Sequence, residues 1–124
     1  MTSSQRAARS AAPQIALILV GLVVGAGAVY HQTLGFEFVN ADDQTYITDN
    51  LRVQRGLTGA NVVWAFTSMS VSNWHPLTWL SHMLDIEIYG LEARGHHLSN
   101  VLLHIANGVL LFALLRSLTG ALWR

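Results

Sequence analysis

Two long apolar stretches dominate the hydrophobic pattern of the chain. Residues 11–30 read AAPQIALILVGLVVGAGAVY and contain no charged side chain. A helix needs about 20 apolar residues to cross the hydrocarbon core of a bilayer, so this stretch predicts a first transmembrane helix. Residues 96–118 are interrupted by polar side chains in their first half but are apolar afterwards, and they predict a second span.

The segment between the spans, residues 31–95, contains two shorter helical patterns. LTGANVVWAFTS predicts a short helix capped by Thr58. SNWHPLTWLSHMLDIEIYG predicts a second helix, which starts near Asn73 or His75 because Pro76 is tolerated only in a first turn. The apolar face expected on this second helix consists of Leu77, Leu80 and Leu84, with Trp79 and Met83 alongside.

The first part of this segment, HQTLGFEFVNADDQTYITDN, is predicted to be irregular, with at most a short extended piece. Trp64, Trp74 and Trp79 favour the membrane–water interface, so both short helices are expected to lie at the bilayer surface. The predicted fold class is an all-α membrane protein, in which two transmembrane helices are joined by a long outer loop that carries interfacial helices.

The arginine positions predict the orientation of the spans. Arg6 and Arg9 precede the first span, and Arg116 and Arg124 lie at or beyond the end of the second. Because basic residues concentrate in cytoplasmic segments, both ends are expected in the cytoplasm and residues 31–95 outside it. That loop holds all seven acidic residues and only three of the seven arginines, as expected for an outer loop.

The chain therefore divides into a tail, two spans, an outer loop and a final turn. The final residues, ALWR, have no helix cap and are expected to lead into another segment. An alternative for the first span is a signal peptide that is cleaved after Ala26-Gly27-Ala28. The predicted boundaries are 1–10, 11–30, 31–95, 96–118 and 119–124.

Composition excludes several classes of protein. The chain is 52% hydrophobic and 11% charged, whereas a soluble domain carries about 25% charged residues. It has no cysteine, so disulfides and thiolate chemistry are excluded. The basic residues are few, dispersed and all arginine, so no basic patch for nucleic acid exists.

Asp42 and Asp43 are the first candidates for chemistry. They follow the first span by about a dozen residues and are flanked by apolar and aromatic residues such as Phe38 and Tyr46. A carboxylate that is partly shielded from water can take a proton from an attacking hydroxyl as a general base. The alternative is a solvated acidic turn or helix cap.

Arginines and histidines supply further candidates. The planar arginine side chain suits phosphate recognition, although a solvated loop arginine is the alternative. The six histidines could include metal ligands, or they could be interfacial or core residues with satisfied hydrogen bonds. No H-x3-H or H-E-x-x-H spacing occurs, so no specific metal site is predicted. The sequence assigns no cofactor, and it leaves binding of a divalent metal ion as an alternative. The candidate substrate-binding residues are Arg52, Arg55, His75 and His97.

A polar stripe in the second span points to partner helices. Asn100, His104 and Asn107 recur at helical spacing, on one face. Polar side chains within a membrane face a wet cavity or the interior of a bundle, or they bond across helices. Either interpretation requires further transmembrane helices around this one.

Four blocks of the sequence together resemble a known family: FVNADDQTYITDN, GLTGANVVWAFTS, SNWHPLTWLSHMLD and GHHLSNVLLHIANGVLLFALLRSLTGALWR. They are similar to the N-terminal part of the TMTC-type glycosyltransferases, which carry transmembrane helices and tetratricopeptide repeats, in a bacterial version. The resemblance runs from about Phe36 to Arg124. It implies a GT-C type multi-span bundle, of which this chain would be a fragment.

The resemblance also implies a function. Such enzymes move a sugar from a polyprenyl-phosphate donor to an acceptor hydroxyl, often a protein Ser or Thr, at the outer membrane face. Asp42 and Asp43 match the acids of their first loop, where one is the general base and the other positions the acceptor or a cation. Ala41 departs from the pattern, because an aromatic residue is expected there. The later part of such an enzyme is absent, so the chain alone is not expected to catalyse transfer.

The implied partners are the lipid-linked sugar donor, an acceptor protein or glycan, the lipid bilayer and further transmembrane helices. The implied location is a multi-pass position in the bacterial inner membrane. A second hypothesis, from another class, is a two-span membrane protein with a structural or assembly role and no catalytic activity.

Overall fold

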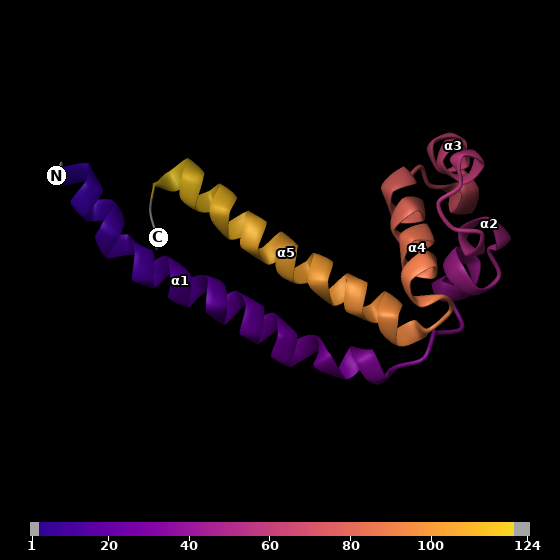
Figure 1. Ribbon diagram of the computed structural model, residues 1–124, viewed down its shortest axis with the longest axis horizontal. Coiled ribbons are helices and arrows are strands. Elements are labelled where there is room, and N and C mark those ends of the chain that lie inside the picture. The colour runs from indigo at the N-terminus through magenta and orange to yellow at the C-terminus, as the bar shows by residue number, and fades with distance from the viewer. Residues whose placement is uncertain (1–2, 121–124) are drawn as a thin grey trace. The chain divides into compact units, whose positions relative to one another are not determined.

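The computed structural model describes residues 3–120, and the side chains from residue 12 onward. Within that range every regular element is a helix (Figure 1), which confirms the all-α part of the predicted fold class. The α-helices are α1 (Ser3–Tyr30), α2 (Leu51–Gln54), α3 (Gly59–Thr67), α4 (Pro76–Tyr89) and α5 (Ala93–Thr119). Two short 3₁₀ helices, η1 (His31–Gly35) and η3 (Ser70–Ser72), and a π-helix, η2 (Gln44–Thr48), complete the order.

Two compact units divide the chain. One comprises α1 with His31 and the part of α5 from Asn100 onward. The other, called the loop unit here, comprises Gln32–Ser99 and therefore includes the first turns of α5. The loop unit contains α2, α3, α4, η2 and η3, the acidic pair and four of the six histidines, which are His75, His82, His96 and His97.

Two helices are long and apolar enough to cross a membrane. The stretches concerned are Ala12–Gly35 and Ala93–Thr119, and the latter has 27 residues. At about 1.5 Å per residue, such a helix exceeds the thickness of the hydrocarbon core, which is about 30 Å. The most apolar part of each stretch has no buried residue, so its side chains are free to contact lipid or other helices.

Both long helices begin earlier than the sequence predicted. Helix α1 starts at Ser3 and includes most of the predicted tail, in agreement with the high helix propensity of its alanines and arginines. Helix α5 starts at Ala93, because Gly90 ends α4 in a left-handed conformation (φ 63°) and only a short turn follows. The side chains of Arg6 and Arg9, and residues 121–124 with Arg124, lie outside the described residues.

The loop unit is organised around α4, which contacts α2, α3 and η2 (Figure 1). Its centre is a cluster of four fully buried side chains from three helices. Partly buried aromatic and aliphatic side chains pack around that cluster and include Tyr46 and Trp64. The four central residues are Val53, Ala65, Trp79 and Met83.

Side-chain caps explain where the short helices begin. The Asn50 side chain accepts hydrogen bonds from the backbone N–H groups of the first turn of α2. The Thr58 hydroxyl accepts the N–H of Asn61 at 3.2 Å, so the predicted Thr58 cap of α3 is confirmed. Helix α4 begins at Pro76 with His75 as its N-cap residue, so of the two predicted starts His75 is close and Asn73 is too early.

The turn between α2 and α3 is held by polar contacts to two side chains, Asn61 and Glu87. The Asn61 amide donates to the carbonyl oxygens of Arg52 at 3.0 Å and Gly56 at 2.9 Å. From α4, a Glu87 carboxylate oxygen accepts the N–H of Leu57 at 2.8 Å. Gly56 has φ +72° and faces Glu87 so closely that a side chain at this position would displace the carboxylate.

The structure corrects two details of the prediction. The buried apolar face of α4 is Trp79 and Met83, whereas Leu77 is 74% exposed and Leu84 is 46% exposed. The apolar pattern of α4 runs nearly all the way round, so only the positions of its neighbours decide which side is buried. Residues 42–48 form a helical turn rather than an extended piece, since η2 packs on α4 and α2.

A pair of truncations on α4 tests this orientation. Met83→Ala should lower the free energy of unfolding by about 2–5 kcal/mol, because it leaves a cavity beside Trp79. Leu77→Ala should change it by only about 0.5 kcal/mol, because the side chain is exposed. Denaturation of the detergent-solubilised protein, followed by tryptophan fluorescence, measures both. A larger loss for Leu77→Ala would contradict the observed face.

Candidate functional site

The acidic pair lies at the start of the helical turn that leads into η2. Asp43 has helical backbone angles (φ −59°, ψ −31°), and its carboxylate reaches back to accept the N–H of Val39 at 2.8 Å. This contact closes the short turn that contains Ala41. Asp43 is half-buried as a result, whereas Asp42 is exposed. The two neighbouring carboxylates therefore differ in environment.

Helix η2 places an aromatic ring on α4. The Tyr46 ring stacks on Trp79, with ring centroids 5.0 Å apart, and on His75 at 5.5 Å. It also meets the His82 imidazole edge-on at 6.1 Å. Because Tyr46 follows Asp43 by three residues, the same helical turn brings both residues to this surface of α4.

His75, Trp79 and His82 form one row along α4, at helical spacing. The pKa of His82 is lowered mainly because burial disfavours its charged form. Electrostatic repulsion from His96 and His75 lowers the pKa of His82 further, whereas attraction to the carboxylates of Asp85 and Asp43 raises it. Neutral imidazole is therefore the favoured form of His82 at neutral pH.

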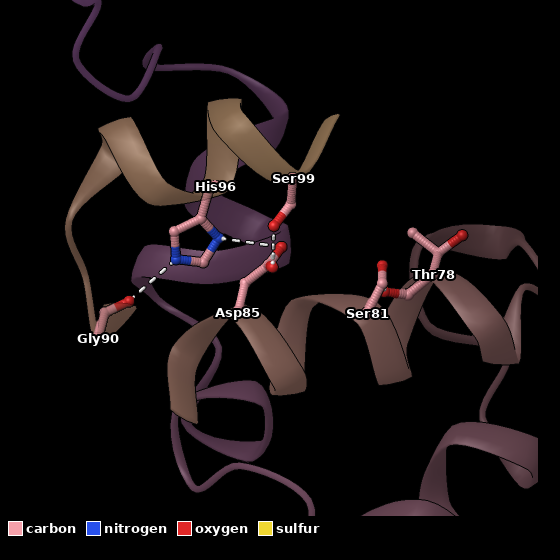
Figure 2. Close-up of polar contacts among 6 residues, drawn as sticks. All are labelled: Thr78, Ser81, Asp85, Gly90, His96 and Ser99. Atoms are coloured by element: carbon pink, nitrogen blue, oxygen red, sulfur yellow. Dashed lines mark hydrogen bonds and ion pairs between the residues drawn. The ribbon is translucent and has the colours of Figure 1, made fainter. Parts of the chain in front are cut away.

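One turn further along α4, Asp85 belongs to a polar network with the first turns of α5 (Figure 2). The Ser99 hydroxyl donates to one Asp85 carboxylate oxygen at 2.5 Å. The His96 Nδ1 atom lies 3.8 Å from the other oxygen. The His96 Nε2 atom bonds to the Gly90 carbonyl oxygen at 2.9 Å. Asp85 is 6% exposed and His96 is 2% exposed, so this network is buried.

The segment before the acidic pair covers this network. The Phe38 ring meets the His96 ring edge-on at 5.2 Å, and it lies 6.4 Å from the His97 ring. Phe38 precedes Val39, whose N–H holds the Asp43 carboxylate. The acidic turn is thereby attached both to α4, through Tyr46, and to the start of α5, through Phe38.

The predicted substrate-binding residues fall into two groups. His75 and His97 both belong to the aromatic and histidine-rich surface described above. Arg52 and Arg55 are exposed at α2, and in the described part of the chain no hydrogen bond or ion pair joins either of them to a histidine or to the acidic pair. Arg52 instead lines a hollow of about 480 Å³ at the junction of η2 and α2.

Sequence reasoning missed Asp85, His96 and Ser99 as site residues. Part of the signal was present, because His82 and Asp85 are three residues apart and so share one face of α4. Metal-ligand spacings such as H-x3-H occur within one helix, whereas His82, Asp85 and His96 come from two helices. His96 and Ser99 join the site only because the turn after Gly90 folds the start of α5 back toward α4.

Several buried nitrogen atoms around this site lack a hydrogen-bond partner within the described range. Most buried polar atoms in proteins have one, so a group of such atoms marks a surface that can bind a ligand or an ion. The atoms are His75 Nε2, Trp79 Nε1, His82 Nδ1, His96 Nδ1 and His97 Nε2.

The contribution of the Asp85 network can be measured with two serines that Figure 2 shows. Ser99→Ala should lower the free energy of unfolding by about 1.5–3 kcal/mol, because a buried carboxylate loses a donor. Ser81→Ala is the matched control, since the Ser81 hydroxyl donates only to the Thr78 carbonyl of its own helix at 3.0 Å. Its effect should stay within about 0.5 kcal/mol. Denaturation experiments in which Ser99→Ala and Ser81→Ala lose the same free energy of unfolding would show that the hydrogen bond from Ser99 to Asp85 does not stabilise the fold.

Comparison with known proteins found no matching family model, no similar curated protein and no similar solved structure. The glycosyltransferase family that the sequence motifs resemble therefore stays an expectation.

Proposed function

We propose that this chain forms the amino-terminal part of an integral membrane glycosyltransferase of the GT-C type. In this proposal the protein transfers a sugar from a polyprenyl-phosphate donor to an acceptor hydroxyl, such as that of a protein Ser or Thr. The observation that carries the proposal is the acidic pair, whose two carboxylates differ in exposure and follow a candidate span. The motif resemblance of residues 36–124 supports it.

Asp42 is the proposed general base, because its carboxylate is exposed and can be reached by an acceptor that arrives from water. The acceptor oxygen forms a bond to the anomeric carbon of the donor sugar. The bond between that carbon and the phosphate oxygen breaks, and its electron pair leaves with polyprenyl phosphate. The acceptor proton passes to the Asp42 carboxylate and then to water.

Asp43 is the proposed positioning residue. Its carboxylate already holds the backbone of Val39 at 2.8 Å, so it fixes the shape of the turn that presents Asp42. Its negative charge also acts on the His82 imidazole. A neutral or missing side chain at this position would loosen the turn and shift the base away from the acceptor.

The donor phosphate needs hydrogen-bond donors near the acidic pair. His75 and His97 are suitable, because each has a buried Nε2 atom without a hydrogen-bond partner among the described residues. A protonated or correctly oriented imidazole nitrogen can donate to a phosphate oxygen. Arg52 and Arg55 remain proposed phosphate ligands because their planar side chains suit bidentate contacts, and being exposed, they are accessible to a ligand.

The proposed location is a multi-pass position in a bacterial inner membrane, with residues 31–95 outside the cytoplasm. One exposed apolar surface of the loop unit suits the membrane–water interface. A hollow of about 350 Å³ is lined by Phe66, Trp74 and Pro76, among others. The Trp74 indole donates to the Phe66 carbonyl at 2.9 Å and stays largely exposed, as interfacial tryptophans do.

The second candidate function is a structural or assembly role without catalysis. It is favoured by the exposure of the apolar side chains on both candidate spans, which need lipid or other helices as cover. The polar stripe of Asn100, His104 and Asn107 likewise suits contacts between helices. The two candidates differ in their dependence on Asp42.

Replacement of Asp42 distinguishes the glycosyltransferase candidate from the structural candidate. In membranes that contain the protein expressed from its complete reading frame, Asp42→Asn should slow transfer from radiolabelled polyprenyl-phosphate hexoses by about 10²–10⁴-fold, the contribution of a general base. Glu37→Gln is the matched control, because Glu37 is an exposed acid of the same segment outside the pair. It should transfer at the wild-type rate. Wild-type rates in Asp42→Asn would remove the assigned role, and no transfer by the wild type with any donor would favour the structural candidate.

A further inference from the structure

We infer that His82, Asp85 and His96 form a binding site for one divalent transition-metal ion, for which Zn²⁺ is the best match. This site is separate from the proposed base, and the inference does not depend on sugar transfer. It is argued from the geometry of the three side chains, from the buried nitrogen atoms and from the groups that orient the ligands.

The three side chains can present their ligand atoms to one point. One ligand atom of each residue lies within 4.8 Å of the other two. With metal–ligand bonds of about 2.0–2.2 Å, neighbouring ligands of tetrahedral zinc are about 3.3 Å apart. The His96 Nδ1 and Asp85 Oδ2 atoms are 3.8 Å apart, so this pair needs only a small approach to reach that spacing. His82 and Asp85 come from α4, and His96 comes from the first turns of α5.

The hydrogen bond to Gly90 determines which nitrogen of His96 is available. A carbonyl oxygen can only accept, so the Nε2 atom of His96 carries the proton of that 2.9 Å bond. In the neutral ring, the lone pair is then on Nδ1, which faces the Asp85 carboxylate. Two hydrogen-bond acceptors that face one another inside a protein repel, and a cation between them removes the repulsion.

The burial of these atoms is the second line of evidence. His96 is only 2% exposed, and its Nδ1 atom has no hydrogen-bond partner within the described range. The Nδ1 atom of His82 is also buried and without such a partner. Two imidazoles with buried, unpartnered nitrogen atoms close to one buried carboxylate match the composition of an N,N,O metal site.

The surrounding contacts match those that orient metal ligands in proteins. A ligating histidine usually donates its other N–H to a carbonyl or carboxylate, as His96 does to Gly90 (Figure 2). A ligating carboxylate is usually held by a hydrogen bond, as Asp85 is by the Ser99 hydroxyl at 2.5 Å. The Phe38 ring packs against the His96 ring, with ring centroids 5.2 Å apart.

The ligand types and charges select the class of ion. Two imidazoles and one carboxylate suit Zn²⁺ and related transition metals, whereas Mg²⁺ and Ca²⁺ prefer oxygen ligands throughout. Asp85 offsets one positive charge of the ion, and the charge of Asp43 acts on the same His82. The competing explanation is a metal-independent ion pair between Asp85 and protonated His96. Such a pair bonds at about 2.7–2.9 Å, which is shorter than the 3.8 Å separation here.

Zinc titration of the tag-free chain in detergent, after treatment with a chelator, tests the inference. Isothermal titration calorimetry should show one Zn²⁺ per wild-type chain, and added Zn²⁺ should raise the thermal denaturation midpoint. Ser99→Ala should weaken binding by about 10–100-fold, because it removes a group that orients a ligand. His82→Asn and Asp85→Asn should weaken it further and should remove the thermal shift. Co²⁺ in place of Zn²⁺ should give visible absorption bands in the wild type and not in His82→Asn or Asp85→Asn.

A control variant separates this site from adventitious binding. His31→Asn changes an exposed histidine outside the loop unit and should bind Zn²⁺ as the wild type does. Circular dichroism in the presence of chelator shows whether each variant retains its helices. Equal Zn²⁺ affinities of the wild type and His82→Asn, or an equal loss in His31→Asn, would overturn the site. A wild-type denaturation midpoint that does not respond to Zn²⁺ would do the same and would leave the ion pair as the explanation.

Discussion

The burial of Trp79 and Met83 on α4 is the constraint on which the loop unit depends. These two side chains fill the centre of a small cluster with Val53 from α2 and Ala65 from α3. No other helix of the unit is long enough to bury an apolar face alone, so α2, α3 and η2 are stable only against α4. Removing this contact would separate all of them at once, because most helical stability in proteins comes from packing rather than propensity.

The same packing decides which polar side chains meet. With Trp79 turned inward, His75 and His82 are carried to the side of α4 where Tyr46 stacks. Three residues before Tyr46, Asp43 reaches the same surface, and its bond to Val39 shapes the turn beneath Asp42. The proposed base and the proposed metal ligands thus share one small structural unit, and both depend on the orientation of a single helix.

Much of the fold was predictable because it follows from local chemistry. Apolar length indicated the two long helices, and the Thr58 cap and Pro76 indicated where α3 and α4 begin. The buried face of α4 was not predictable, because leucine, tryptophan and methionine occur around most of its circumference. The helical turn at residues 42–48 was also missed, since its polar residues suit a turn equally well and only contact with α4 and α2 stabilises the helix.

The sequence by itself determined the helical class, the two apolar stretches that could cross a membrane and the presence of an acidic pair after the first of them. These features depend on residues that are neighbours in the chain, so composition and spacing are sufficient to reveal them. Only the tertiary structure decided that Asp42 is exposed while Asp43 is held, and that His96 and Ser99 meet Asp85. His96 and Asp85 are brought together by the turn at Gly90 and by the packing around Trp79. The physical reason is that local spacing encodes neither the direction of a turn nor the side on which a helix packs.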